Sequence, residues 1–236
     1  MREAAPVRLE IRARANEVHA IREERRWPPL GVRWTPLYLR PGELHLAPAV
    51  TGARVRLPVP DGAATFIFRV PEELELVGPM KLRLHVELQG TTDANLFVAV
   101  SKVEGGASGA AEQGRSLPFE GPFGFGCDVV ARGWLRVAHR RLDEARGEPH
   151  RPFLLGDRAE PLGPGEVAPV EIEILPSATH FHRGDVVRLE IWGRWFWRRS
   201  MFFGTYPCTY ADSPSGTVIL HMGDSHDAHL LVPLIP

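Results

Sequence analysis

Apolar and polar residues alternate strictly along many short segments of the chain. Residues 170–174 read VEIEI and residues 187–191 read VRLEI. Period-two alternation places the apolar side chains on one face of a β-strand and the charged ones on the other. Each segment therefore predicts a half-buried strand, as in a sandwich whose inner faces form the core. Pro176 is expected to end the first strand because proline cannot donate to a strand ladder, and residues 183–185 (RGD) supply turn chemistry before the second.

Similar short apolar runs recur from one end of the chain to the other. They predict roughly ten to twelve strands and no long helix, which is typical of an all-β sandwich or barrel. Residues 16–26 are highly charged and are compatible with a short helix or a further strand. Residues 47–63 are rich in Pro, Gly and Ala and predict a loop. The expected strands are residues 7–12, 34–39, 44–46, 65–70, 81–88, 95–103, 134–139, 170–174, 187–192, 217–221 and 230–235, with residues 192–203 as a further segment.

Two stretches predict irregular connections. Residues 104–122, with GGASGAAEQG at their centre, predict a mobile surface loop, and residues 140–169 predict a long connection. The length of 236 residues suits one β domain over residues 1–236, with residues 1–30 as a lead-in strand and linker.

Composition narrows the functional classes. A net charge of −1 leaves no basic footprint for nucleic acid or for an anionic membrane surface, so neither is expected as a partner. Cys127 and Cys208 are too few for a disulfide framework, which favours a reducing compartment. The first residues lack the apolar core of a signal peptide, and no stretch approaches the ~20 apolar residues of a membrane span. We therefore expect a cytoplasmic protein.

No serine is placed for nucleophilic catalysis. A nucleophile elbow needs G-x-S-x-G between a strand and a helix. The nearest string, residues 106–110 (GASGA), lacks the final glycine and lies in the expected loop. Neither cysteine has a better context, so we predict no catalytic residue in this chain.

Histidines offer possible metal ligands. His180 and His182 form an H-x-H whose two rings would share a face of a strand. A second group could supply nitrogen and carboxylate ligands, but its spacing matches no zinc signature. Structural or surface roles are favoured for both groups, and no metal or other cofactor is predicted. The members of the second group are His221, Asp224, His226, Asp227 and His229.

An aromatic and basic cluster follows the 187–192 strand. Trp195 and Trp197 are two residues apart and would face the same way on a strand, where they could stack on sugar rings. Trp and Arg are also enriched at protein interfaces. We favour a docking surface, which comprises Trp192, Arg194, Trp195, Trp197 and Arg198.

The order of the motifs resembles a known family. It is similar to the C-terminal jelly-roll domain, a non-catalytic and galactose-binding-domain-like β-sandwich, of the X-prolyl dipeptidyl-peptidase and cocaine esterase group of serine hydrolases. The most specific run is residues 133–136 (GWLR) with His139, Arg140, Asp143, Pro149, His150 and residues 164–166 (PGE). The resemblance spans essentially the whole chain. Its other segments are residues 7–12, 27–28, 34–39, 77–79, 82–86, 93–103, 170–192, 216–221 and 234–236.

Two departures from the family pattern stand out. The serine usual before the family's His-Arg is Ala138 here, and the family's second aspartate near Asp93 is Asn95. The α/β-hydrolase domain that carries the family's Ser–His–Asp triad is absent from these residues, so the resemblance carries no catalytic residue onto any position.

The resemblance implies a non-catalytic module. Such a module would pack on an α/β-hydrolase domain, in cis or in trans, and help to shape its active-site cleft or its oligomer. Two alternatives remain at this stage. One is a free-standing β-sandwich that binds carbohydrate or another ligand, and the other is self-association through an orphaned docking face.

Overall fold

The computed structural model describes residues 6–105, 116–119, 129–196 and 211–235, and the regular secondary structure of these residues is almost entirely β-strand. Their only helical element is the short 3-10 turn η2, Val137–His139. Within these ranges no helix is long and apolar enough to cross a membrane. The all-β prediction is thereby confirmed. The strands are β1 (Val7–Arg14), β2 (Glu17–Glu24), β3 (Arg33–Arg40), β4 (Glu43–His45), β5 (Ala53–Val59), β6 (Ala63–Arg69), β7 (Leu74–Gln89), β8 (Asn95–Val103), β9 (Val129–Arg136), β10 (Val167–Phe181), β11 (Val186–Trp192), β12 (Gly216–Met222) and β13 (His229–Ile235).

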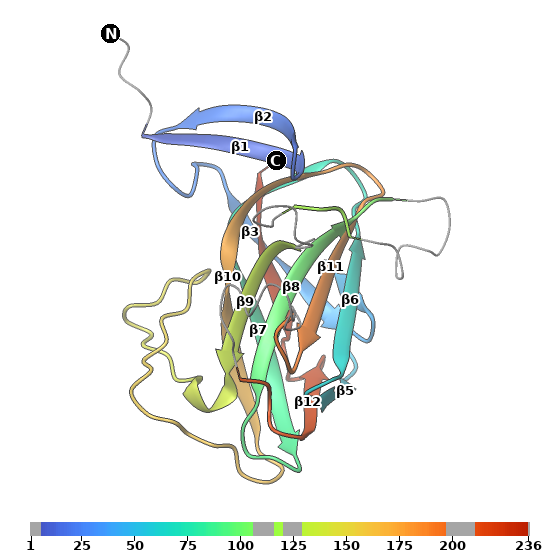
Figure 1. The fold of residues 1–236 in the computed structure, drawn as a ribbon, viewed down its shortest axis with the longest axis vertical. Coiled ribbons are helices and arrows are strands. Elements are labelled where there is room, and N and C mark those ends of the chain that lie inside the picture. Colours follow the sequence, from blue (N-terminus) through green and yellow to red (C-terminus); the bar gives the residue numbers. More distant parts are fainter. Residues whose placement is uncertain (1–5, 106–115, 120–128, 197–210, 236) are drawn as a thin grey trace, which may run out of the picture.

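The described strands form one 13-stranded sheet in the order β2-β1-β10-β9-β8-β11-β6-β4-β3-β13-β7-β12-β5. An additional antiparallel pairing of β10 with β7 closes this sheet on itself. The result is a closed, barrel-like body with the β1–β2 hairpin lying across one end (Figure 1). The all-β part of the prediction therefore holds, and the described strands belong to one continuous closed sheet.

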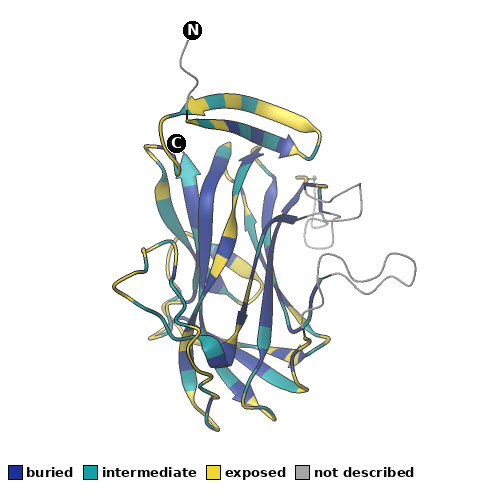
Figure 2. Ribbon diagram, turned by 60° about the vertical axis from the view of Figure 1, so that its left-hand side comes forward, coloured by how far each residue is buried: buried dark blue, intermediate teal, exposed yellow. Residues whose placement is uncertain are grey.

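The main core lies inside this closed sheet (Figure 2). Alternation in β7 shows why: Met80, Leu82, Leu84 and Val86 are fully buried, whereas Arg83 between them reaches the outside. Burying one such side chain contributes roughly 1.5–3 kcal/mol relative to leaving it exposed. The same period-two pattern in β10 and β11 confirms that residues 170–174 and 187–191 are half-buried strands.

A second, smaller core lies under the hairpin. Leu9 and Ile11 of β1 pack against Val77 of β7, with Ile235 at the edge of the group. Residues 17–24, for which a helix or a strand was possible, form β2 and pair antiparallel with β1. The expected linker at residues 1–30 thus contains a second strand.

The prediction of a loop at residues 47–63 is wrong for residues 53–59, which form β5. In β5, Leu57 and Val59 are buried and alternate with exposed Arg56 and Pro58. Proline is tolerated because β5 lies at the edge of the sheet, where one side of the strand has no ladder to complete. The expected loop at 104–122 lies mostly outside the described residues.

Two other boundaries differ from expectation. Pro176 does not end the strand: β10 continues to Phe181, and the pairing with β7 shifts register between Ile174 and Ser177. A bulge of this kind accommodates a residue that cannot donate to the ladder. The strand predicted at 134–139 ends instead at Arg136, where η2 begins.

Candidate functional site

A row of aromatic residues crosses the outer face of three neighbouring strands. Phe97 of β8 is in register with Trp192 of β11 and with Trp134 of β9. Leu96 and Val98 on either side of Phe97 belong to the main core. Alternation therefore directs Phe97 and its cross-strand neighbours to the outside of the barrel.

Trp195 covers this row. Its ring makes edge contacts with Phe97, at a centroid distance of 5.5 Å, and with Trp134, at 6.0 Å. Phe196 adds a tilted contact with Trp195 at 5.2 Å. Phe97 is 2% exposed and Trp195 8%, whereas Trp134 retains 39% exposure. The outcome is an aromatic cluster, comprising Phe97, Trp134, Trp192, Trp195 and Phe196, on a face where charged residues are usual.

Only some of the predicted docking residues lie in this aromatic cluster. Trp192 and Trp195 belong to the aromatic cluster. The Arg194 guanidinium lies 5.3 Å from the centre of the Trp192 ring and 3.4 Å from an Asp61 carboxylate oxygen. Trp197 and Arg198 lie outside the described residues. Trp195 is not on a strand, because β11 ends at Trp192.

Gly193 explains the change of direction after β11. A Cβ at this position would lie 2.4 Å from a Val59 methyl carbon, so only glycine allows the chain to pass there.

Phe97 and Trp134 were not among the predicted docking residues. Each was read as part of a strand, and only the cross-strand register brings them together.

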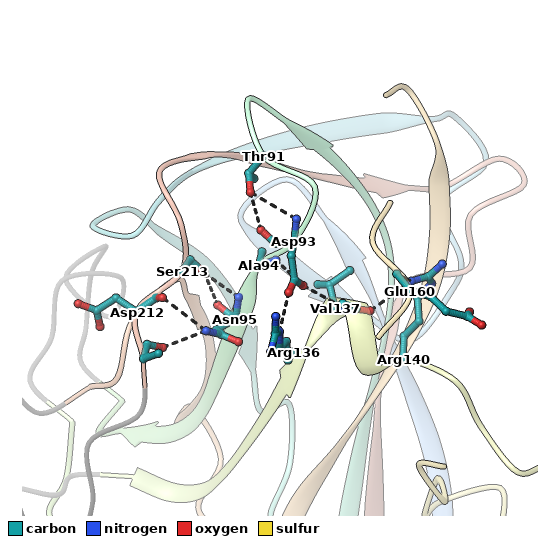
Figure 3. A network of polar contacts seen from close by, with 12 residues as sticks. Thr91, Asp93, Ala94, Asn95, Arg136, Val137, Arg140, Glu160, Asp212 and Ser213 are labelled. Atoms are coloured by element: carbon teal, nitrogen blue, oxygen red, sulfur yellow. Dashed lines mark hydrogen bonds and ion pairs between the residues drawn. The ribbon is translucent and has the colours of Figure 1, made fainter. Parts of the chain in front are cut away.

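A polar network borders the aromatic cluster at the start of β8 (Figure 3). The Asp93 carboxylate accepts hydrogen bonds from the backbone N–H groups of Ala94 and Ala138, both at 2.9 Å. It also accepts one from Nε of Arg136 at 2.6 Å. Three donors thus converge on one carboxylate and tie the start of β8 to the end of β9.

A second arginine, four residues after Arg136, extends this network (Figure 3). Arg140 donates to the carbonyl oxygens of Val137 and Glu160 and lies 3.6 Å from a Glu166 carboxylate oxygen. The backbone N–H of Glu160 in turn donates to the carbonyl of Ala138 at 2.7 Å. Arg140, a member of the most specific motif, therefore fixes the long 140–166 connection against η2, whereas Arg136 of the same motif holds Asp93.

Asn95 departs from the family pattern, and its contacts use the amide. Its side-chain nitrogen donates to the carbonyl oxygens of Ala211, at 3.0 Å, and Asp212, at 3.4 Å. Its backbone N–H donates to Ser213 Oγ, which donates back to the Asn95 carbonyl. A carboxylate at this position could not donate to carbonyls, so asparagine suits the segment around residue 212. A cavity of ≈420 Å³ lies between this segment, Phe97 and Trp134.

The H-x-H pair lies at the end of β10, under the hairpin. The rings of His180 and His182 are perpendicular, with centroids 4.5 Å apart, and His19 of β2 stacks on His180 at 3.7 Å. Burial, reinforced by the charges of His19 and His182, lowers the pKa of His180. Glu73, just before β7, places a carboxylate oxygen 3.3 Å from Nδ1 of His182.

The second histidine group does not converge on one point. Nε2 of His221 lies 3.0 Å from a carboxylate oxygen of Glu87. The Asp227 carboxylate instead contacts Nε2 of His85, at 2.9 Å. Burial lowers the pKa of both His226 and His229. Among the residues described, only Glu73, His180 and His182 bring three possible metal-ligand atoms within 4.8 Å of one another.

Comparison with known proteins agrees with the motifs. The family model described as the X-Pro dipeptidyl-peptidase C-terminal non-catalytic domain matches residues 2–231. A CocE/NonD family hydrolase from Staphylococcus aureus has a similar structure, with a TM-score of 0.87 and 25% identity over 98% of this chain and 42% of the hydrolase. An α-amino acid ester hydrolase shares the fold, with a TM-score of 0.61 and 15% identity over 91% of this chain and 39% of that one.

Curated relatives match a shorter stretch. A Mycobacterium bovis protein that bears the name "Putative serine esterase Mb1866c" is 38% identical over 69 residues, which are 27% of this chain and 11% of that protein. The chain thus spans about two fifths of the length of the solved hydrolases and matches a small part of the esterase. Because the family model covers nearly all of it, the chain belongs to the family of X-Pro dipeptidyl-peptidase C-terminal non-catalytic domains found in CocE/NonD-type hydrolases.

Proposed function

We propose that this chain is the non-catalytic module of an X-prolyl dipeptidyl-peptidase or cocaine-esterase-like serine hydrolase. In this role it packs on an α/β-hydrolase domain and shapes that domain's active-site cleft or its oligomer. The family match supports the proposal, as does the length of the similar S. aureus hydrolase, of which 58% lies outside the part that this chain covers (100% minus 42%). The reaction would be acyl transfer from an ester or an X-prolyl amide to water, with the serine supplied by the other domain.

The aromatic cluster is the observation that carries the packing role. Trp134 offers 39% of its surface to solvent, although its neighbours Phe97 and Trp195 are buried. A partly exposed tryptophan held by a rigid aromatic surround matches the anchors that dominate protein interfaces. The occupant we propose is an apolar surface of the hydrolase domain.

Replacing Trp134 by alanine is expected to weaken capture of the hydrolase by about 30-fold or more, since truncating an interface anchor costs about 2 kcal/mol or more. The chain would be immobilised and exposed to an extract of the producing cells, and captured serine hydrolases would be labelled with a fluorophosphonate. Trp27→Ala is the matched control, because Trp27 is 41% exposed and lies outside the aromatic cluster.

Labelled hydrolase captured equally by both variants would remove Trp134 from the interface. If the chain captures no labelled hydrolase and light scattering shows only self-association, the packing role itself is wrong.

The isolated chain is expected to hydrolyse neither p-nitrophenyl esters nor X-Pro anilides above the buffer rate. The reason is that no G-x-S-x-G string occurs in its sequence. Initial rates with and without a serine-directed inhibitor provide the measurement. Turnover that the inhibitor abolishes would contradict the non-catalytic assignment.

The carbohydrate-binding alternative loses its main support among the described residues. Stacking on a sugar requires an open aromatic face, whereas Trp195 is 8% exposed and contacts three other aromatic rings. Trp197, the second member of the supposed platform, lies outside the described residues.

A further inference from the structure

Glu73, His180 and His182 are brought together by the antiparallel pairing of β10 with β7. This pairing ends at Phe181, which is opposite Leu74. The residues that come next beyond the ends of these two strands are His182, after β10, and Glu73, before β7. A carboxylate therefore lies beside the second histidine of the H-x-H. The two residues are 109 positions apart in the chain, which is why the sequence did not group them.

The ring of His180 carries a buried nitrogen without a hydrogen bond. Nδ1 of His180 has no hydrogen-bond partner within the described part of the chain, and the residue is only 3% exposed. Such atoms are rare in folded proteins, because burying a polar group without a partner costs free energy. Stacking by His19 at 3.7 Å and an interplanar angle of 6° holds the ring in place.

The distances suit a small divalent cation. Metal–ligand bonds of about 2.0–2.1 Å in a tetrahedral zinc site separate neighbouring ligand atoms by about 3.4 Å. The Nδ1 atom of His182 and the Glu73 carboxylate oxygen are already 3.3 Å apart, and all three ligand atoms lie within 4.8 Å. Small side-chain rotations of the two exposed residues would complete the geometry.

The charge balance is also compatible with a cation. Glu73 contributes one negative charge. Lys102, which donates to the carbonyl of His180, is neutralised by Asp185 at 3.1 Å. His19 is not a fourth ligand in this arrangement, because the lone pairs of two stacked imidazoles lie in two nearly parallel ring planes and therefore do not meet at one metal ion.

We propose that Glu73, His180 and His182 form a binding site for a divalent transition-metal cation of the zinc type, with a fourth position open to solvent. Two imidazoles and a carboxylate are a ligand set that zinc accepts. His180 is the buried, preorganised ligand. Glu73 and His182, whose side chains are 66% and 55% exposed, provide the route of entry.

The test is a titration of the whole chain with Zn²⁺ after dialysis against a chelator, followed by calorimetry and thermal melting. We expect one site per chain and a higher melting midpoint, which chelator reverses. His182→Gln and Glu73→Gln should each weaken Zn²⁺ binding by at least about 100-fold, because even outer-shell partners of a metal account for about 10–100-fold in affinity. Both side chains are exposed, so the variants should fold normally.

His45→Gln is the matched control. His45 is also an exposed histidine that contacts a glutamate, Glu43 at 2.7 Å, but it has no second histidine beside it. Titration with Co²⁺ adds a spectroscopic readout, since a tetrahedral site gives intense visible absorption. Wild-type affinity in both His182→Gln and Glu73→Gln overturns the proposal. It is equally overturned if His226→Gln, in the second histidine group, is the variant that abolishes binding.

Discussion

Lys102→Met should lower the free energy of unfolding by about 3–5 kcal/mol, the range seen when one partner of a buried ion pair is removed. Lys102 is 1% exposed on β8. Its ammonium lies 3.1 Å from a carboxylate oxygen of Asp185, and it donates to the carbonyl oxygens of Ala13 and His180 at 3.1 and 2.8 Å. One side chain thus joins β1, β8, β10 and the turn before β11.

The size of this effect comes from the Asp185 carboxylate, which stays buried after the ammonium is removed. Asp185 is 5% exposed and accepts hydrogen bonds from the backbone N–H groups of Gly105 and His182. Without the ammonium, its carboxylate is a buried charge with no cationic partner in the described contacts. Methionine keeps most of the apolar stem, so the loss of stability reports the missing ammonium and not a large cavity.

Urea unfolding with an unchanged m-value measures the difference. Lys81→Met is the matched control: Lys81 is also largely buried and lies 2.9 Å from Glu171, but Glu171 keeps Arg83 at 3.2 Å. Its expected loss is about 1 kcal/mol, the size of one hydrogen bond, because Glu171 retains a cationic partner in Arg83. Equal losses in the two variants would mean that the Lys102–Asp185 pair has no special role.

Much of the fold could be predicted from local sequence because strand periodicity is a local property. Residues 82–88 of β7, 170–174 of β10 and 187–191 of β11 alternate strictly, and each of these stretches is half buried. β5 was missed because Pro58 and the glycines and prolines on either side of the strand resemble a loop, and the tolerance for Pro58 arises from the position of β5 at the edge of the sheet. That position depends on pairing with β12, more than 150 residues away along the chain.

The candidate sites were predictable only in part for the same reason. Trp192 and Trp195 stood out as aromatic residues, but Phe97 and Trp134 join them through cross-strand register. Likewise, the H-x-H at His180 was visible in the sequence, whereas Glu73 reaches it through the end of the β7–β10 pairing. Local patterns identify the residue types, and the long-range pairing decides which of them meet.

Asp93→Ala should lower the free energy of unfolding by about 2–4 kcal/mol, because leaving a buried donor unsatisfied costs about 1–3 kcal/mol. The backbone N–H groups of Ala94 and Ala138 both donate to this carboxylate, and both residues are almost completely buried. Water cannot readily replace the lost acceptor. Arg136, whose side chain is 56% exposed, is solvated when it loses Asp93 and adds little to the cost.

Two further variants separate the backbone contacts from the charge. Asp93→Asn keeps an oxygen for the two N–H groups and loses only the ion pair with Arg136, so its loss should be less than half that of Asp93→Ala. Asp143→Ala is the matched control, since Asp143 also accepts from two backbone N–H groups, those of Ala145 and Arg146, but these are exposed. Water can satisfy them, and the expected cost is about 1 kcal/mol or less. If Asp93→Asn is as damaging as Asp93→Ala, the ion pair and not the buried backbone determines the stability of this junction, and the role assigned to the Asp93 network is wrong.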